Sequence, residues 1–264
     1  MSKRNIDRIG EINKNNFGTE MKIVEYKNNK NVTVEFQDKY KCRKICYYDS
    51  FKKGLVLNPY DRTTFGVGYF GEGKYDCKSY NDIYTCWKDM LKRGYSKEFK
   101  EKCPTYKDCF VCEEWHNFQN FAKWFEENYY ECNGETMHLD KDILIKGNKI
   151  YSPETCVFIP RKINSLFVKC NKKRGRYPIG VTVYYNKNNN HKCLRVSCNI
   201  FDKNKKRTTF KYLGYFPLNR PFQAFTCYKN FKEKHIKQVA DEYKDFIPKK
   251  IYKAMCKWIV EIND

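Results

Sequence analysis

The residues between Met137 and Asn164, MHLDKDILIKGNKIYSPETCVFIPRKIN, combine acid, amide and imidazole side chains at spacings that suit metal-assisted hydrolysis. Asp140 follows an apolar residue, and Asn164 comes after a polar turn at residues 146–149 and a Tyr-Ser-Pro sequence. A carboxylate and an amide offer the hard oxygen ligands that Mg²⁺ prefers. The pattern predicts that a hairpin and a helix bring Asp140 and Asn164 together as ligands of one Mg²⁺ or Mn²⁺ ion.

Three neighbours of Asp140 are candidates for activating a water molecule. His138 and Asp142 each lie two residues from Asp140, so on an extended strand all three side chains share one face. A neutral imidazole suits proton abstraction near pH 7, whereas Lys141 is protonated there and is expected to hold a phosphate unless its pKa is strongly depressed. The alternative for His138 is a solvated strand residue with no catalytic role.

The segment resembles HNH endonucleases of bacteriophages, those with a Leu-Asp-X-Asp strand, a Tyr-Ser-Pro-Glu-X-Cys link and an Asn on the final helix. Upstream, GVGYFGEGKY (66–75), YTCWKDMLKRGYS (84–96) and YKDCFVCEEWHNFQNFAKWF (106–125) are similar to the lead-in segments of that family. The resemblance implies that Asp140 and Asn164 are the two metal ligands. It also places Lys141 where the family has its general-base His, and Thr155 where the family has its middle Asn.

The activity implied by the resemblance is metal-dependent phosphodiester hydrolysis by an endonuclease. One site per chain favours nicking of a single strand. The departures at Lys141 and Thr155 leave a second hypothesis open, a catalytically degenerate protein that binds DNA or RNA or inhibits a host nucleic-acid machine.

The charge distribution indicates a nucleic-acid partner. The chain has 52 Lys and Arg against 31 Asp and Glu, a net charge of +21. Residues 169–212 contain thirteen Lys and Arg and one acid, a local charge of +12. Such a basic segment predicts phosphate binding that weakens steeply with salt, with double-stranded DNA as the first expectation and RNA as the alternative. A lysine-rich surface that is only solvated, from an organism with A·T-rich codons, is the competing interpretation.

The basic segment also has a predicted fold. Strand-like runs at 181–185, 193–201 and 208–216 are separated by polar turns, and residues 222–243 have helical periodicity. This order resembles the Apetala-type DNA-binding domain of plant ethylene-response factors, in which the sheet enters the major groove. The resemblance implies that exposed side chains of the sheet and its turns contact DNA, and the candidates are Arg174, Arg176, Tyr184, Lys192, Arg195, Lys205, Arg207 and Lys211.

The expected fold class is α+β with several domains. Alternating apolar residues at 21–26 and 31–36 predict a hairpin in a β-rich accessory module, residues 1–60. Residues 61–168 are expected to form the HNH-like ββα-metal domain, in which a helix with an aromatic face at 115–125 is assigned to the core rather than to base stacking. Residues 169–264 are expected to hold the Apetala-like three-stranded antiparallel sheet, its helix and a capping helix beyond Pro248.

Other motifs are assigned to structure. Cys109-x-x-Cys112 has zinc-ligand spacing but lacks a matching second pair, so no zinc is expected and the fourteen cysteines are interpreted as reduced thiols, many of them buried. Gly66-x-Gly68-x-x-Gly71 lacks the strand and helix of a dinucleotide site and predicts a loop. No apolar run approaches the roughly 18 residues of a membrane span, which predicts no membrane partner and a place in the cytoplasm of an infected bacterial host. The sequence does not identify a host protein partner.

Overall fold

The computed structural model describes residues 8–168, 176–186, 191–202, 207–262 and 264. It contains both helices and sheets, so the predicted α+β class is confirmed. The chain divides into two compact units, one formed by residues 1–128 and 149–153 and the other by residues 129–148 and 154–264. The predicted domain boundaries at residues 60/61 and 168/169 fall inside these two units, and they stay predictions.

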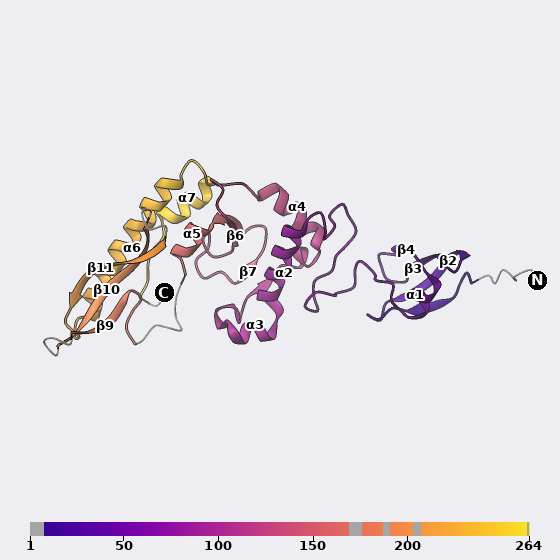
Figure 1. Ribbon diagram of the computed structural model, residues 1–264, viewed down its shortest axis with the longest axis horizontal. Helices are drawn as coiled ribbons and strands as arrows, with labels where there is room; N and C mark the ends of the chain where they lie inside the picture. The colour runs from indigo at the N-terminus through magenta and orange to yellow at the C-terminus, as the bar shows by residue number, and fades with distance from the viewer. Residues whose placement is uncertain (1–7, 169–175, 187–190, 203–206, 263) are drawn as a thin grey trace, which may run out of the picture. The chain divides into compact units, whose positions relative to one another are not determined.

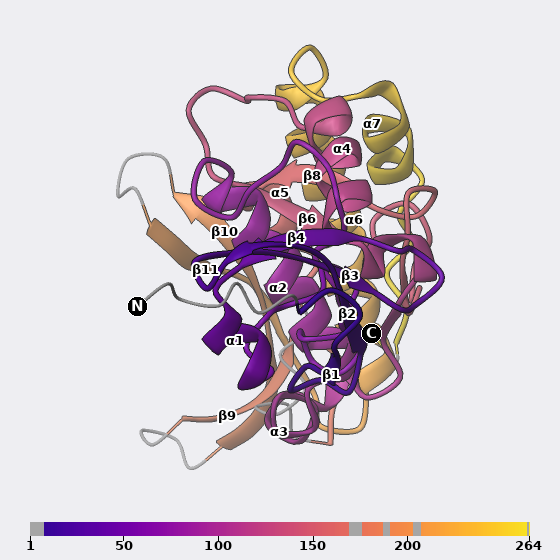
Figure 2. The same cartoon turned by 90° about the vertical axis from the view of Figure 1, so that its right-hand side faces the viewer.

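The first unit begins with a four-stranded antiparallel sheet in which each strand pairs with the next along the chain. The predicted hairpin is confirmed, because Glu20–Asn28 pairs with Asn31–Phe36 across a two-residue turn. The fully buried side chains of the sheet come from these two central strands, and helix α1 lies beside the sheet (Figure 2). The elements are β1 (Ile12–Lys14), β2 (Glu20–Asn28), β3 (Asn31–Phe36), β4 (Arg43–Cys46) and α1 (Tyr48–Lys52).

The rest of the first unit is helical around an aromatic core. Trp87, Trp115, Phe118 and Phe121 are each at most 1% exposed, and their rings contact one another edge-on or tilted. The assignment of these aromatic residues to the core is therefore confirmed. The elements are α2 (Asn81–Tyr95), α3 (Lys97–Lys102), η1 (Pro104–Tyr106), β5 (Phe110–Val111), η2 (Glu113–His116), α4 (Phe118–Asn128) and β7 (Ile150–Tyr151), which pairs with β5.

The glycine-rich segment at residues 66–73 is a loop, as predicted. Gly71 has a φ of +71°, and a Cβ atom there would lie 2.3 Å from Asn117 Oδ1. Only glycine combines this backbone conformation with so close an approach. This glycine therefore serves backbone packing rather than nucleotide binding.

The second unit contains a short β-hairpin followed by a helix, a three-stranded antiparallel sheet and two C-terminal helices (Figure 1). The three strands expected near the C-terminus and the long helix after them are confirmed, with the helix beginning at Pro221. The elements are β6 (Met137–Asp140), β8 (Val157–Pro160), α5 (Arg161–Leu166), β9 (Val181–Asn186), β10 (His191–Asp202), β11 (Arg207–Phe216), α6 (Pro221–Tyr243) and α7 (Lys249–Cys256).

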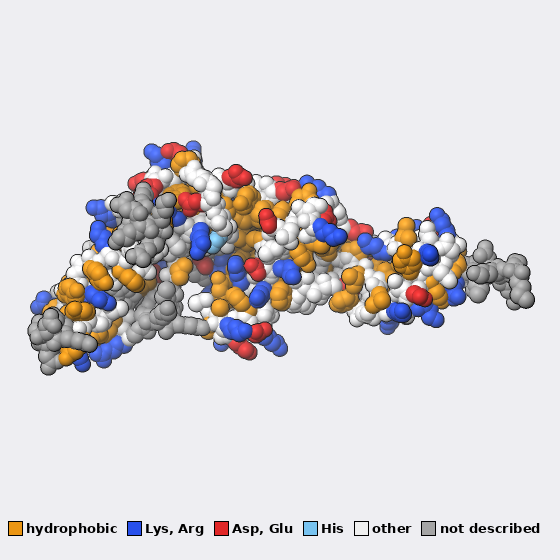
Figure 3. Space-filling view, in the orientation of Figure 1, with side chains coloured by type: hydrophobic (Ala, Val, Ile, Leu, Met, Phe, Trp, Pro, Cys, Tyr) orange, Lys and Arg blue, Asp and Glu red, His pale blue; other side chains and the backbone are white. Residues whose placement is uncertain are grey.

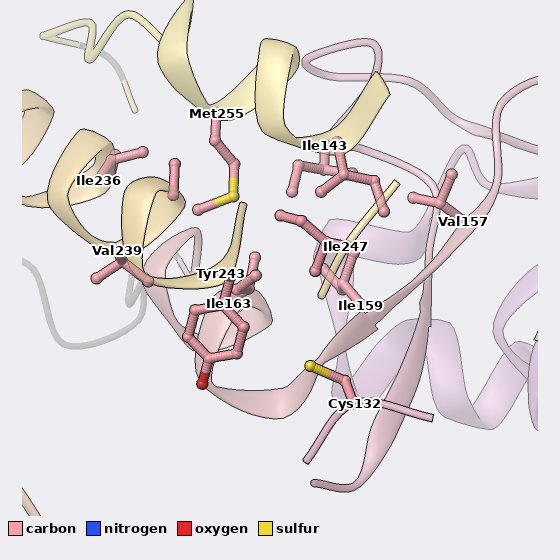
Figure 4. Packing of buried hydrophobic residues seen from close by; sticks show 12 residues of the cluster. Cys132, Ile143, Val157, Ile159, Ile163, Ile236, Val239, Tyr243, Ile247 and Met255 are labelled. Carbon is pink, nitrogen blue, oxygen red and sulfur yellow. The ribbon is translucent and has the colours of Figure 1, made fainter. Parts of the chain in front are cut away.

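Helix α6 contributes to two hydrophobic cores. Its first half covers one face of the β9–β11 sheet through Ala224, Phe225 and Tyr228. Its second half packs on the β6–β8–α5 elements and α7 through Ile236, Val239, Ala240 and Tyr243 (Figure 4). One continuous helix of 23 residues thus supports both the hairpin that contains Asp140 and the basic sheet.

The turn before β9 fits tightly against α6. Gly180 has a φ of +78°, and a Cβ atom there would lie 2.0 Å from the Tyr228 ring. The early glycine of this segment therefore has a packing role that the sheet depends on.

Candidate functional site

The candidate site is built on the antiparallel pair β6–β8 and on helix α5, which follows β8 directly. Every residue of β8 is buried, as expected for a short apolar run that lies inside a core. The strand ends at Pro160, a residue whose fixed φ suits a helix start but which cannot donate a backbone hydrogen bond. The sequence Val157–Pro160 therefore ends the strand and starts the helix at adjacent residues, which brings α5 back toward β6.

The structure brings His138 and Asn164 into contact. Their side chains approach to 3.0 Å, between Asn164 Nδ2 and His138 Nδ1. When the amide nitrogen donates this hydrogen bond, the neutral imidazole holds its proton on Nε2, and Asn164 Oδ1 remains available as an acceptor or ligand. His138 is two residues before Asp140 on β6, so both side chains leave the same face of the strand.

The Asp140 carboxylate is fixed by the turn that follows β6. Its Oδ1 atom accepts hydrogen bonds from the backbone amides of Asp142, at 2.9 Å, and Ile143, at 2.7 Å. Burial raises the pKa of this carboxyl group, while the two amides oppose that effect. Within the described part of the chain its hydrogen bonds use Oδ1 alone, which leaves Oδ2 for another ligand.

Lys141 does not occupy an open position beside a phosphate. Its side chain is 7% exposed, and Nζ donates to Asp142 Oδ1 and to the Asn148 carbonyl, each at 2.7 Å. Asn148 Nδ2 in turn donates to the Lys141 carbonyl at 2.8 Å. Lys141 thus closes the loop of residues 141–148 and does not face solvent in this conformation, and its expected phosphate-holding role stays a prediction.

The expectation that Asp142 shares the strand face of Asp140 is wrong. Strand β6 ends at Asp140, because the Asp140 carboxylate binds the next amides in a turn that an extended strand does not allow. The Asp142 carboxylate pairs with Lys141 instead. Thr155, the counterpart of the family's middle Asn, is half-buried in the turn that precedes β8.

The candidate nucleic-acid contacts divide between the two faces of the β9–β11 sheet. Cross-strand register places Tyr184 and Arg195 on the face opposite α6. Lys192 is two residues before buried Leu194 on β10, and Lys211 pairs with buried Cys198, so both lie on the helix side of the sheet. There the Lys211 ammonium is 5.1 Å from the Phe231 ring centroid. The two lysines therefore lie on the other face of the sheet from Tyr184 and Arg195, and the DNA contacts expected of all four stay predictions.

The remaining candidates are Arg174, Arg176, Lys205 and Arg207. Arg176 is exposed and donates to the Tyr177 hydroxyl at 3.0 Å. Arg207 begins β11, but its side chain is outside the description, and Arg174 and Lys205 lie outside the described residues.

Sequence reasoning missed the aromatic residues of β11. Phe210, Tyr212 and Tyr215 lie on the open face, where the Arg195 guanidinium is 5.3 Å from the ring centroids of both Tyr184 and Tyr212. Alternation along residues 208–212 predicts the first two. It does not predict Tyr215, because a bulge at Leu213 shifts the register by one residue.

Comparisons with protein-family models, curated proteins and solved structures gave no significant match. Among the residues that the structure describes, no group of three or more His, Cys, Asp or Glu side chains is placed to hold a metal ion. No helix in the same residues is long and apolar enough to cross a bilayer.

Proposed function

We propose that this chain is a metal-dependent endonuclease of the HNH type, similar to the bacteriophage enzymes, that hydrolyses phosphodiester bonds in double-stranded DNA. The observation that carries the proposal is the contact between His138 on β6 and Asn164 on α5, beside an acid on the same strand face. A base, an amide and a carboxylate thus belong to one strand–strand–helix unit, and together they suit metal-assisted hydrolysis.

The ligands of the metal would be Asp140 and Asn164. The donor set fits one hard divalent ion, because it has one carboxylate whose Oδ2 is available and one amide oxygen left over from the His138 contact. Two protein ligands do not fill the coordination sphere, which agrees with Mg²⁺ sites, where the ion usually keeps several water ligands. Bound there, Mg²⁺ or Mn²⁺ would stabilise the leaving oxygen and the charge that develops on the phosphate.

His138 is the best candidate for the general base. In the tautomer that accepts from Asn164 Nδ2 the proton is on Nε2, so Nδ1 would be the accepting atom once Asn164 releases this hydrogen bond. A neutral imidazole accepts a proton near pH 7. Lys141 and Asp142 are less suitable, because each neutralises the other in an ion pair with an N–O distance of 2.7 Å. Lys141 in this account stabilises the loop behind the site.

The DNA partner is supported by charge. The net charge of +21, concentrated in the segment 169–212, favours a polyanion and predicts strong salt dependence. One site per chain favours nicking of one strand over double-strand cleavage.

The test is cleavage of supercoiled plasmid in the presence of Mg²⁺, Mn²⁺ or a chelator. We expect metal-dependent relaxation by the natural protein, loss of relaxation for Asp140→Ala, and unchanged relaxation for Ser165→Ala. Ser165 is the matched control, since it is exposed on α5 next to Asn164. Relaxation that persists in Asp140→Ala would contradict the proposal.

A second candidate function is nucleic-acid binding without cleavage. The observation in its favour is the ion pair of Lys141, which occupies the position where the resembled family has its base. In this case the plasmid is not cleaved with any of the metal ions, but the protein retards its migration on a gel. The Asp140→Ala variant should retard it equally.

A further inference from the structure

The open face of the β9–β11 sheet carries aromatic side chains in positions where a soluble sheet normally carries polar ones. The other face of the sheet is covered by α6 and is fully apolar at Leu194 and Val196. On the open face Phe210, Tyr212 and Tyr215 are 66%, 59% and 58% exposed. Figure 3 shows hydrophobic side chains interspersed with Lys and Arg over the part of the molecule that holds these strands.

These rings are organised around one arginine. The rings of Tyr184 and Tyr215 have centroids 5.4 Å apart across the sheet. The Arg195 guanidinium lies 5.3 Å from the centroids of Tyr184 and Tyr212, which makes it the centre of a cation–π cluster. Its Nε atom is buried and has no hydrogen-bond partner among the described residues.

The charge of the sheet selects the kind of partner. The three strands contain four Lys and Arg and a single acid, but Lys192 and Lys211 lie on the helix side, so the cation described on the open face is Arg195. An exposed apolar surface within a basic sheet suits a partner that has both flat apolar groups and negative charge. A nucleic acid has both, in its bases and its phosphates.

The residue types further favour unpaired bases over a duplex. A duplex exposes only the edges of its bases, in its grooves, and these edges are recognised by hydrogen-bonding side chains such as Arg, Asn and Gln. Phe210 has no such group, and the one arginine of the cluster lies against tyrosine rings. Bases of a single strand expose their flat faces, and aromatic side chains on a sheet stack with those faces in many single-strand-binding proteins.

We propose that the open face of β9–β11, formed by Tyr184, Arg195, Phe210, Tyr212 and Tyr215, binds single-stranded nucleic acid by base stacking. The binding does not rest on cleavage by the β6–β8–α5 unit. Either property can therefore fail without the other.

The test is fluorescence anisotropy with labelled oligothymidylate, oligouridylate and a duplex of the same length, about 12 nucleotides, in a chelating buffer that prevents cleavage. We expect both single strands to bind more tightly than the duplex. Tyr212→Ala and Tyr215→Ala should weaken single-strand binding roughly 5- to 100-fold each, the range that base–aromatic stacking covers. Tyr212→Phe and Tyr215→Phe should bind within about twofold of the natural protein, because the ring remains.

Controls separate stacking from charge and from misfolding. Phe222→Ala removes an equally exposed ring, 70% exposed, from the first turn of α6 and should leave affinity unchanged. The alanine variants should keep the salt dependence of the natural protein, since they remove no phosphate contact. Because all three positions are exposed, circular dichroism should show an intact fold.

Two results would overturn the proposal. One is single-strand affinity that the tyrosine-to-alanine variants leave unchanged. The other is a duplex bound at least as tightly as either single strand. Preference for oligothymidylate or for oligouridylate would identify DNA or RNA as the partner. Asp140→Ala, which tests the nuclease, should bind both strands as the natural protein does.

Discussion

Replacement of Lys141 by methionine distinguishes a structural lysine from a catalytic one. Methionine keeps most of the apolar stem but removes the ammonium that bonds Asp142 and the Asn148 carbonyl, each at 2.7 Å. The Asn148 carbonyl loses a charged donor at a part-buried contact, which costs about 1.5–3 kcal/mol. The Asp142 side chain is 45% exposed, so its lost ion pair adds only about 0–1 kcal/mol.

The sum predicts that Lys141→Met lowers the free energy of unfolding by about 1.5–4 kcal/mol. Urea denaturation followed by circular dichroism measures this loss, with the exposed neighbour Lys149→Met as a control that should change stability by less than about 1 kcal/mol. Plasmid nicking, corrected for the folded fraction, should remain. A variant that unfolds like the natural protein but no longer nicks DNA would refute the reasoning and identify Lys141 as a residue that acts on the substrate.

Three further outcomes are expected. Gly180→Ala should lower the free energy of unfolding by about 2–4 kcal/mol in the same urea assay, because the new Cβ meets Tyr228 at 2.0 Å and φ is +78°; a loss below about 1 kcal/mol would contradict the tight fit. Ile159→Ala, at a fully buried position of β8, should cost about 2–5 kcal/mol, and a neutral result would mean that the strand is not in the core. Burial, together with the Glu72 carboxylate, raises the pKa of the Cys42 thiol to about 12. Iodoacetamide near pH 8 should therefore label exposed Cys77 well before Cys42, as measured by mass spectrometry. The reverse order of labelling would contradict the buried position of Cys42.

The regular elements were predictable because their apolar residues repeat with the period of the element. Alternation at 21–26 and 31–36 gave the first hairpin, and the periodicity of residues 222–243 gave α6 to within one residue. The position of Lys192 on the helix side was also predictable from the sequence, because Lys192, Leu194 and Val196 are two residues apart and share one face of the strand.

Other features depend on interactions that a linear pattern does not contain. The bulge at Leu213 reverses the alternation and turns Tyr215 to the open face. Asp142 leaves the strand because the Asp140 carboxylate binds its amide, and Lys141 turns inward to a carbonyl seven residues further along the chain. The contact of His138 with Asn164 joins residues 26 positions apart, so sequence spacing gave both residues but not their meeting.

The most direct test of the account is the initial rate of plasmid nicking by His138→Ala beside the natural protein, in Mg²⁺ and at matched folded concentration. If His138 is the base, the rate falls roughly 100- to 10,000-fold while binding of the plasmid is retained. If His138→Ala nicks at the rate of the natural protein, His138 is not the base. If neither protein nicks DNA that both bind, the β6–β8–α5 unit is not a nuclease site.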